Sequence, residues 1–161
     1  MGLEKELMSQ EECPFCKIAR KEMQAFIVGE NQNAIAFLDL NPANFGHVLV
    51  TTKKHHEELE ELSEEEMRDL FGLLREVVRK VKKLKVTVGD EEFEPYGVTV
   101  LLRLGKEADQ AIKHIAFHVI PRTPTDNVYI AWRPVLNFAE ILMNPQLVQL
   151  MEEIRKKLSE A

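Results

Sequence analysis

One stretch of the chain, beginning near Ser63, repeats apolar residues at helical intervals. Its apolar positions are Met67, Leu70, Phe71, Leu74, Val77, Val78, Val81 and Leu84. Ser63 and Glu66 have the spacing of a capping box, in which each side chain bonds the backbone of the other residue. The pattern predicts one long helix whose apolar stripe packs on a sheet.

Short runs rich in β-branched and aromatic residues lie on both sides of this helix, and such runs favour strands. In sequence letters they are AFIV, AIAFLDL, HVLVTT, YGVTVLLRL and HIAFHVIPR. The turn-like GENQN joins the first two and predicts a hairpin, and polar stretches follow the third and precede the fifth. We therefore expect an α+β fold with about five mainly antiparallel strands and one long helix.

The two ends of the chain differ from this central part. Residues 1–12 are polar and acidic, and we expect a short helix or frayed extension there. Residues 13–124 should form the main domain, followed by a C-terminal extension at 125–161. In that extension YIAWRPV, residues 129–135, predicts a strand, and the amphipathic segment 144–158 predicts a final helix.

Composition narrows the class of protein. With 161 residues, 45% apolar and 30% charged, the chain suits one ordinary globular domain. The net charge of −6 argues against binding of a nucleic acid polymer, so a phosphate ligand must be held by a local site. No apolar run approaches the roughly 20 residues that cross a bilayer, and the N-terminus has no signal-peptide core. We expect a soluble, cytoplasmic protein without a membrane partner.

Two histidines and a small residue alternate in HIAFHVIPR. In a strand His114, Ala116 and His118 point to one face, with consecutive members about 6.6 Å apart, twice the rise per residue. The outer histidines then flank a space and cannot easily share one small ligand. On this spacing alone, two hydrogen-bonded core or surface histidines are the better explanation.

The residues around this alternation resemble the histidine triad family, whose signature alternates three histidines with hydrophobic residues. Gln110 precedes it and Pro121-Arg122 follow it, as in that family. Upstream, AIAFLDLNPANFGHVLVTTKKHH resembles the family's N-terminal half, and CPFCKI resembles the opening of many prokaryotic members. The resemblance covers Cys13 to Arg122, roughly two thirds of the chain. Ala116 stands where the family has its central histidine.

The resemblance implies nucleotidyl hydrolysis or transfer, in which the central histidine attacks the α-phosphate and forms a nucleotidyl-histidine intermediate. An imidazole that is neutral near pH 7 is a competent nucleophile. The implied substrates are adenosine phosphoramidates or dinucleoside polyphosphates. Because Ala116 offers no nucleophilic atom, we expect this chain to be catalytically inactive.

The resemblance also implies roles for other positions. His118 would contact the α-phosphate, and Gln110 would touch the phosphate or the leaving group. His47 corresponds to an additional active-site histidine that supports the triad, in which His114 is the first member. Asp39 would accept hydrogen bonds from the ribose hydroxyls. The apolar slot for the base would consist of Ile18, Phe37 and Leu40, although core packing explains each of these equally well.

Two departures from the family lie near the phosphates. Arg103 stands where many members have asparagine, and Ala111 where a serine or threonine often follows the glutamine. Arg103 would bind a longer phosphate chain, or it is a solvent-facing residue on an edge strand. The leaving-group preference therefore stays open.

Cys13 and Cys16 form a C-x-x-C pair at the start of a predicted short helix. Two thiolates on one tight turn and two imidazoles, His55 and His114, would complete a tetrahedral structural zinc site, and zinc-containing family members take ligands from these positions. His56 is the competing ligand. A redox dithiol is the alternative, but dithiol oxidoreductases place the motif directly after a strand. Thiols without metal are a third alternative.

Three functions are thus in competition. The first is a family enzyme presented without its nucleophile, which suits a deliberate replacement of histidine by Ala116. The second is a naturally inactive nucleotide-binding or sensing protein, which Arg103 and Ala111 favour. The third is a dithiol oxidoreductase, which leaves the other motifs unexplained. The resemblance also implies a homodimer that forms through the long helices and the sheet edges.

Overall fold

The computed structural model describes residues 12–131, 134–135 and 137–160. The chain divides into two compact units, of which the first ends at Val128 and the second spans Tyr129–Ala161. Within the described residues, no helix has the length and apolar character needed to cross a membrane. The N-terminal extension expected at 1–12 lies, apart from Glu12, outside the described residues.

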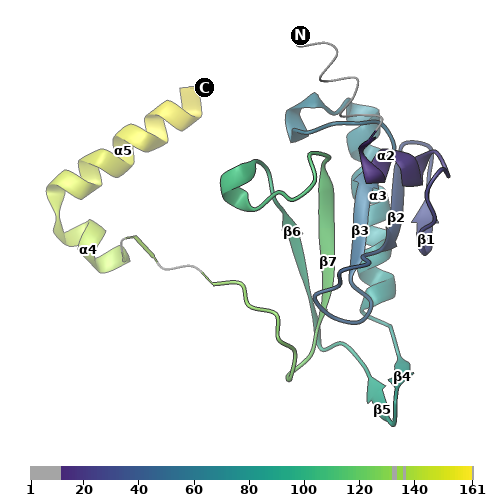
Figure 1. Cartoon of the computed structure of the whole chain (residues 1–161). Coiled ribbons are helices and arrows are strands. Elements are labelled where there is room, and N and C mark those ends of the chain that lie inside the picture. Colours follow the sequence, from purple (N-terminus) through teal and green to yellow (C-terminus); the bar gives the residue numbers. More distant parts are fainter. Residues whose placement is uncertain (1–11, 132–133, 136, 161) are drawn as a thin grey trace. The chain divides into compact units, whose positions relative to one another are not determined.

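The first unit contains a five-stranded sheet (Figure 1). Its strands are β1 (Ile27–Glu30), β2 (Ala34–Leu38), β3 (Val48–Thr52), β6 (Gly97–Leu102) and β7 (Ala116–Arg122). Their order is β1-β2-β3-β7-β6, and every neighbouring pair is antiparallel. The predicted α+β fold, with its five-stranded antiparallel sheet, is confirmed.

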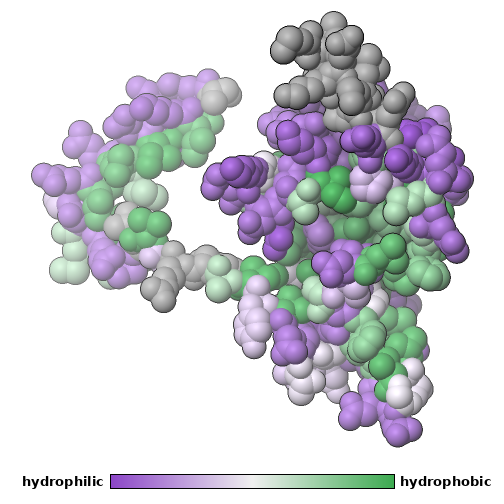
Figure 2. Space-filling model, viewed as in Figure 1, coloured by the Kyte–Doolittle hydropathy of each residue, from purple (hydrophilic) through white to green (hydrophobic). Residues whose placement is uncertain are grey.

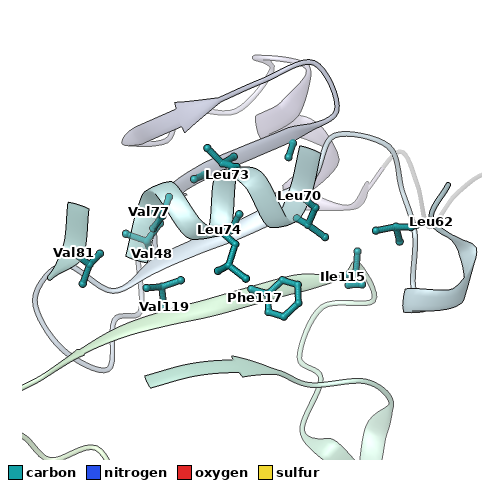
Figure 3. Packing of buried hydrophobic residues seen from close by; sticks show 13 residues of the cluster. Val48, Leu62, Leu70, Leu73, Leu74, Val77, Val81, Ile115, Phe117 and Val119 are labelled. Carbon is teal, nitrogen blue, oxygen red and sulfur yellow. The ribbon is translucent and has the colours of Figure 1, made fainter. Parts of the chain in front are cut away.

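The helix α3 (Glu64–Val81) covers one face of this sheet (Figure 3). It begins with the predicted capping box, since Ser63 Oγ accepts from the Glu66 N–H and the Glu66 carboxylate accepts from the Ser63 N–H. Its buried apolar residues are Leu70, Leu73, Leu74, Val77 and Val81. Met67 and Phe71, expected in the buried stripe, are exposed. The buried stripe therefore differs from the predicted one, since it lacks Met67 and Phe71 and includes Leu73.

Alternation along the strands separates two cores. On β2, Ala34 and Ala36 belong to the core under α3, whereas Ile35 and Phe37 belong to a second core with the helix α2 (Pro14–Ala19). On β7, Phe117 and Val119 face α3, and Ala116 belongs to the second core. Because side chains alternate, Ala116 and His118 point away from α3. The candidate chemistry therefore lies on the sheet face opposite the long helix.

A short hairpin was not predicted. β4 (Val86–Val88) and β5 (Glu91–Phe93) pair across a turn at Gly89 and Asp90, where Gly89 has φ +64°. The sequence signal was only partly present, because the alternating Val86-Thr87-Val88 precedes a Gly-Asp pair but Glu91-Glu92-Phe93 after it does not alternate, and the strands are short and mostly exposed. Two single-turn 3₁₀ helices complete the first unit, at Leu59–Glu61 and Lys106–Ala108.

The second unit contains α4 (Phe138–Met143) and α5 (Pro145–Glu160). α5 is the predicted final helix, and Figure 2 shows its apolar residues gathered along one side. The strand expected at 129–135 is wrong for the residues described there, since 129–131 and 134–135 form no strand. A strand needs a partner ladder, and Pro134 has no N–H to contribute to one.

Candidate functional site

A cavity of about 440 Å³ lies on the sheet face opposite α3. Eight residues discussed from the sequence line it together: Asp39, His47, Arg103, Gln110, Ala111, His114, Ala116 and His118. They come from the end of β2, the start of β3, the end of β6, the loop after it, and β7. The antiparallel sheet thus gathers residues that are up to 79 positions apart, from Asp39 to His118.

His47 and His118 are joined at the cavity wall. The distance between His47 Nε2 and His118 Nδ1 is 3.0 Å. The backbone N–H of Ala43 donates to His47 Nδ1 at 3.0 Å, so that nitrogen is an acceptor and carries no proton. The proton of neutral His47 must then lie on Nε2 and be donated to His118 Nδ1. His118 in turn keeps its own proton on Nε2, as a donor for a ligand.

Both rings favour the neutral form. Burial lowers the pKa of His47, and the Asp39 carboxylate only partly opposes the shift. Burial also lowers the pKa of His118, with the same opposition from Asp39 and a further lowering by the positive charge of Arg103. The hydrogen bond from Ala43 agrees with these directions, because a protonated His47 would lose it.

Asp39 lies directly after β2 and beside the histidine pair. Its backbone N–H donates to the carbonyl of His47 at 2.9 Å, which continues the β2–β3 pairing by one step. Its Oδ1 accepts from the N–H of Asn41 at 2.8 Å, and its Oδ2 lies 3.6 Å from His47 Nε2. One carboxylate oxygen therefore holds the turn while the other is near the cavity.

Ala116 occupies the centre of this arrangement. It pairs with Thr51 across the β3–β7 ladder, and its methyl group packs in the second core with Leu49. Nothing polar projects from it. His118 Nε2 keeps its proton as long as Nδ1 accepts from His47, so this nitrogen is a hydrogen-bond donor with no free lone pair.

The loop after β6 forms another wall. Gly105 has φ +84°, and its N–H donates to Gln110 Oε1 at 2.8 Å, so the glutamine side chain closes the loop. Gln110 Nε2 is 3.5 Å from the carbonyl of Glu57. Arg103 is exposed and lines the cavity immediately before this loop.

The three residues expected to hold a base are not in the cavity lining. Ile18 and Phe37 are buried in the second core, and Leu40 is exposed. Phe15, which sequence reasoning did not single out, lines the cavity and contacts Phe37 edge-on with ring centroids 5.5 Å apart. Its signal was its place inside CPFC, where the α2 turn presents Phe15 beside the two cysteines.

A second group of four side chains lies next to the cavity. Cys13, Cys16, His55 and His114 bring one donor atom each to within 4.8 Å of one another. Cys13 caps α2 and Cys16 lies within it, with Pro14 at the first helical position. The N–H of Ile115 donates to the carbonyl of His56 at 2.7 Å, which ties the segment before β7 to the loop after β3. That tie places His55 and His114 together.

The distances in this cluster suit tetrahedral coordination. Sulfur–nitrogen separations are 3.3 Å for Cys13–His114, 3.3 Å for Cys16–His55 and 3.4 Å for Cys16–His114, all to Nδ1. Bonds of about 2.3 Å to sulfur and about 2.0 Å to nitrogen would put such donors about 3.5 Å apart. Two thiolates and two imidazoles are a donor set typical of structural zinc.

The surroundings of the cluster also suit metal binding. His114 Nε2 donates to the carbonyl of Thr52 at 2.8 Å, which leaves Nδ1 free of a proton, as a metal-bound imidazole requires. Burial lowers the pKa of His114 to about 4, so the ring is neutral. Burial and the neighbouring Cys13 raise the pKa of Cys16 to about 12. Without a cation this sulfur is a thiol, and a bound metal would displace its proton.

His56, the competing ligand, takes no part in the cluster. Its Nε2 lies 3.0 Å from Glu66 Oε1, and its Nδ1 lies 3.5 Å from Glu61 Oε2. Glu66 is also the capping residue of α3, so His56 links the loop to the helix start. The structure thus gives the two adjacent histidines different partners.

The trio Asp39, His47 and His118 also brings donor atoms within 4.8 Å, but its protons do not suit a metal. His47 could reach an ion only through Nε2, which holds its proton while Nδ1 accepts from Ala43. Coordination would require breaking that hydrogen bond. The trio is better suited to hydrogen bonding than to metal binding.

The chain is similar in sequence to known proteins. An uncharacterised HIT-like protein of Methanocaldococcus jannaschii is 34% identical over 143 residues, which are 89% of this chain and 98% of that protein. An adenosine 5'-monophosphoramidase of Schizosaccharomyces pombe is 34% identical over 110 residues, which are 68% of this chain and 74% of that protein.

The chain is also similar in fold to solved structures. A HIT family member from Bacillus subtilis has a TM-score of 0.73 and 29% identity, covering 91% of this chain and 96% of that one. A zinc-bound histidine triad protein from Mycobacterium smegmatis has a TM-score of 0.59 and 25% identity, covering 89% and 99%. The family model of the HIT domain matches residues 20–125. The chain therefore belongs to the HIT domain family.

Proposed function

We propose that the cavity binds an adenosine nucleotide or its conjugate at the α-phosphate, on the scaffold of a hydrolase or transferase that lacks its nucleophile. The observation that carries this proposal is the hydrogen-bonded pair His47–His118, which presents a donor nitrogen beside an alanine. The S. pombe relative, an adenosine 5'-monophosphoramidase, supports the choice of an adenosine conjugate.

Each residue has a role in this proposal. Neutral His118 donates from Nε2 to an α-phosphate oxygen, and His47 keeps that proton in place. Asp39 Oδ2 accepts from a ribose hydroxyl, and Gln110 holds the loop near the leaving group. Phe15 offers an apolar face to the base. His114, which the family places first in the triad, holds the segment that leads into β7.

Nucleotidyl transfer through a histidine would begin with attack of an imidazole nitrogen on the α-phosphorus. The bond to the leaving group breaks, and the nucleotidyl-histidine is then hydrolysed by water. Position 116 is where that imidazole would stand. Because Ala116 has no such atom and His118 is held as a donor, binding without turnover is the expected behaviour of this chain.

Zinc in the cluster of Cys13, Cys16, His55 and His114 is part of the proposal. The sulfur–nitrogen distances support it, and so does the zinc-bound relative from M. smegmatis. When bound, the ion would supply four strong bonds that join α2, the loop after β3 and the segment before β7. Its role would be structural, because all four positions are filled by protein.

A dithiol oxidoreductase has less support. Reactive dithiols are partly exposed and have a lowered thiol pKa, whereas Cys13 and Cys16 are buried and burial raises the pKa of Cys16. Both sulfurs also face imidazole nitrogens. The same residues are better explained as metal ligands.

A homodimer is also part of the proposal. The sheet ends in β6 on one side and β1 on the other, and edge strands have unpaired backbone groups that favour pairing with another chain. Sedimentation equilibrium of the purified protein would give the mass. A monomer at micromolar concentration would contradict this part.

The experiment that tests nucleotide binding is calorimetry with AMP. We expect AMP to bind the present chain, and Asp39→Asn to weaken binding roughly tenfold, since a charged acceptor of a hydrogen bond is lost. Asparagine keeps the side-chain oxygen that accepts from Asn41, so the turn should persist. Asp90→Asn, at the exposed β4–β5 turn, is the matched control.

Two outcomes would contradict the proposal. If AMP binds no more tightly than ribose, the proposed phosphate contact is wrong. If Asp39→Asn and Asp90→Asn bind AMP with equal affinity, the proposed ribose contact of Asp39 is wrong.

A further inference from the structure

We propose that Arg103 makes this cavity selective for nucleotides that have a second phosphate attached to the first, such as a nucleoside diphosphate. This inference rests on the nucleotide binding proposed above and extends it to the class of ligand. Asp39, His118 and Arg103 follow one another along the cavity in the order of the strands that carry or precede them.

The strand order sets a direction. Asp39 follows β2, His118 lies on β7, and Arg103 follows β6, in a sheet ordered β2-β3-β7-β6. Neighbouring strands are about 4.8 Å apart, so His118 is two strands from Asp39, and Arg103 is one strand farther. A nucleotide with its ribose at Asp39 and its α-phosphate at His118 therefore directs its next phosphate towards Arg103.

The side chain of Arg103 is on the correct face. Leu101 pairs with His118 across the β6–β7 ladder and lines the cavity, whereas Leu102 packs against the core under α3. Arg103, the next residue, again lines the cavity. Burial is the main cause that lowers the pKa of His118, and the positive charge of Arg103 adds to the lowering, as expected for two residues that line the same cavity.

Arg103 has no protein partner in the described part of the chain. None of the hydrogen bonds or ion pairs there involves it, whereas Arg122 is paired with Asp126 at 2.9 Å. Among the described residues, no lysine and no other arginine lines this cavity. A guanidinium has five donors in a fixed fork that matches phosphate oxygens, so Arg103 is available for a phosphate.

His118 and Arg103 contact different phosphates of the ligand in this proposal. His118 is a neutral imidazole that donates one hydrogen bond, which suits the α-phosphate. Arg103 is always charged and forked, and its pairing with a second phosphate adds a charge-assisted contact that AMP cannot make. Selectivity for the second phosphate follows from this additional contact.

The negative charge of Asp109 should repel a phosphate ligand, and a substitution at this residue provides a further test. It lines the same cavity, in the left-handed conformation at φ 59°, but forms no ion pair with Arg103. Its charge should weaken binding of every phosphate-bearing ligand. Asp109→Asn should therefore strengthen AMP and ADP binding alike, because asparagine tolerates the same backbone conformation.

The test is calorimetry with AMP and ADP on the intact protein. In the present chain we expect ADP to bind about tenfold or more tightly than AMP, the range of one charge-assisted hydrogen-bonded contact. Arg103→Gln should reduce the ADP-to-AMP ratio to near one, because ADP affinity should fall by clearly more than AMP affinity. Arg103→Lys should keep part of the preference. Arg68→Gln, on the exposed surface of α3, is the matched control.

The outcomes separate this inference from nucleotide binding itself. If AMP binds and ADP has no preference, or if the ratio persists in Arg103→Gln, the inference is wrong and the proposed function stands. If Arg103→Gln weakens AMP and ADP equally, Arg103 contacts the first phosphate, and the inference is wrong. If neither nucleotide binds the present chain, both proposals fail.

Discussion

The Cys/His cluster and the cavity are neighbours that differ in one respect. The cluster has four side chains that can bind a metal, whereas the cavity has an alanine beside its histidines. His114, in the segment before β7, belongs to the cluster and also lines the cavity, and Ala116, two residues later at the start of β7, lines the cavity. In the cluster all four donors converge. In the cavity His47 and His118 share a hydrogen bond, but the side chain of the neighbouring Ala116 is only a methyl group.

The cost of losing a residue explains this difference. Each cluster residue is held by the others, so removing one would leave buried polar atoms without partners, which destabilises a fold. At position 116 an alanine packs in the second core with Ile35 and Leu49 and leaves no polar atom unpaired. An alanine at position 116 is therefore compatible with a well-packed fold.

The largest expected effect concerns position 116 in the cavity. Ala116→His should raise hydrolysis of an adenosine phosphoramidate by three orders of magnitude or more, because covalent nucleophiles contribute on this order. The introduced imidazole would project on the cavity face beside His118. Steady-state assays of both proteins measure the rate, and mass spectrometry after acid-free quenching should find an adenylyl group on residue 116.

Two results would separate the competing explanations of Ala116. A large gain supports an enzyme whose nucleophile was removed. If the variant folds and binds AMP but hydrolyses neither the phosphoramidate nor a dinucleoside polyphosphate, the chain is better explained as a nucleotide-binding protein, with Arg103 and Ala111 as its distinguishing residues.

The next largest effect concerns the Cys/His cluster. Cys13→Ser should abolish stoichiometric zinc and lower the melting temperature by on the order of 10 °C, because metal binding contributes directly to folding. Elemental analysis and thermal unfolding measure both quantities. A chelator should lower the melting temperature of the parent protein and leave that of the variant unchanged. Equal zinc content in the two proteins would contradict the ligand assignment.

A smaller effect concerns the histidine pair. His118→Ala should weaken AMP binding by about tenfold, since one hydrogen bond to a charged group is lost. His47→Phe should weaken it less, because His118 stays in place and only its proton is no longer directed. Calorimetry gives the affinities, and nitrogen-15 shifts of the ring should show the proton of His118 on Nε2 only when His47 is present.

The smallest effect is the pH dependence of the same pair. The pKa values of His47 and His118 are lowered in the folded protein, so the neutral forms are stabilised by folding. This stability is complete above the ordinary histidine pKa of about 6.5 and is lost as pH falls through the lowered values. Urea unfolding at pH 7.5 and 5.5 should show a larger loss for the parent than for His47→Phe. Identical losses would contradict the lowered pKa values.

Local sequence patterns were sufficient for most elements. Ser63 and Glu66 marked the start of α3 because a capping box involves only four consecutive residues. Runs of β-branched residues located β2, β3 and β7 for a similar reason. The alternation through Ala116 and His118 correctly predicted a shared face, since the period of a strand is a local property. The histidine triad resemblance was readable for the same reason.

The sequence by itself therefore determined the helix, the strands of the sheet and the family, whereas the missing nucleophile at position 116 stays a prediction. Only the tertiary structure decided which atoms meet: Cys13 with His114, 101 residues apart, and His55 rather than His56 beside Cys16. It also decided that Ile18 and Phe37 lie in the core and that the Ala43 N–H sets the proton of His47. The physical reason is that such contacts depend on strand order and register, which are set by packing of the whole sheet rather than by neighbouring residues.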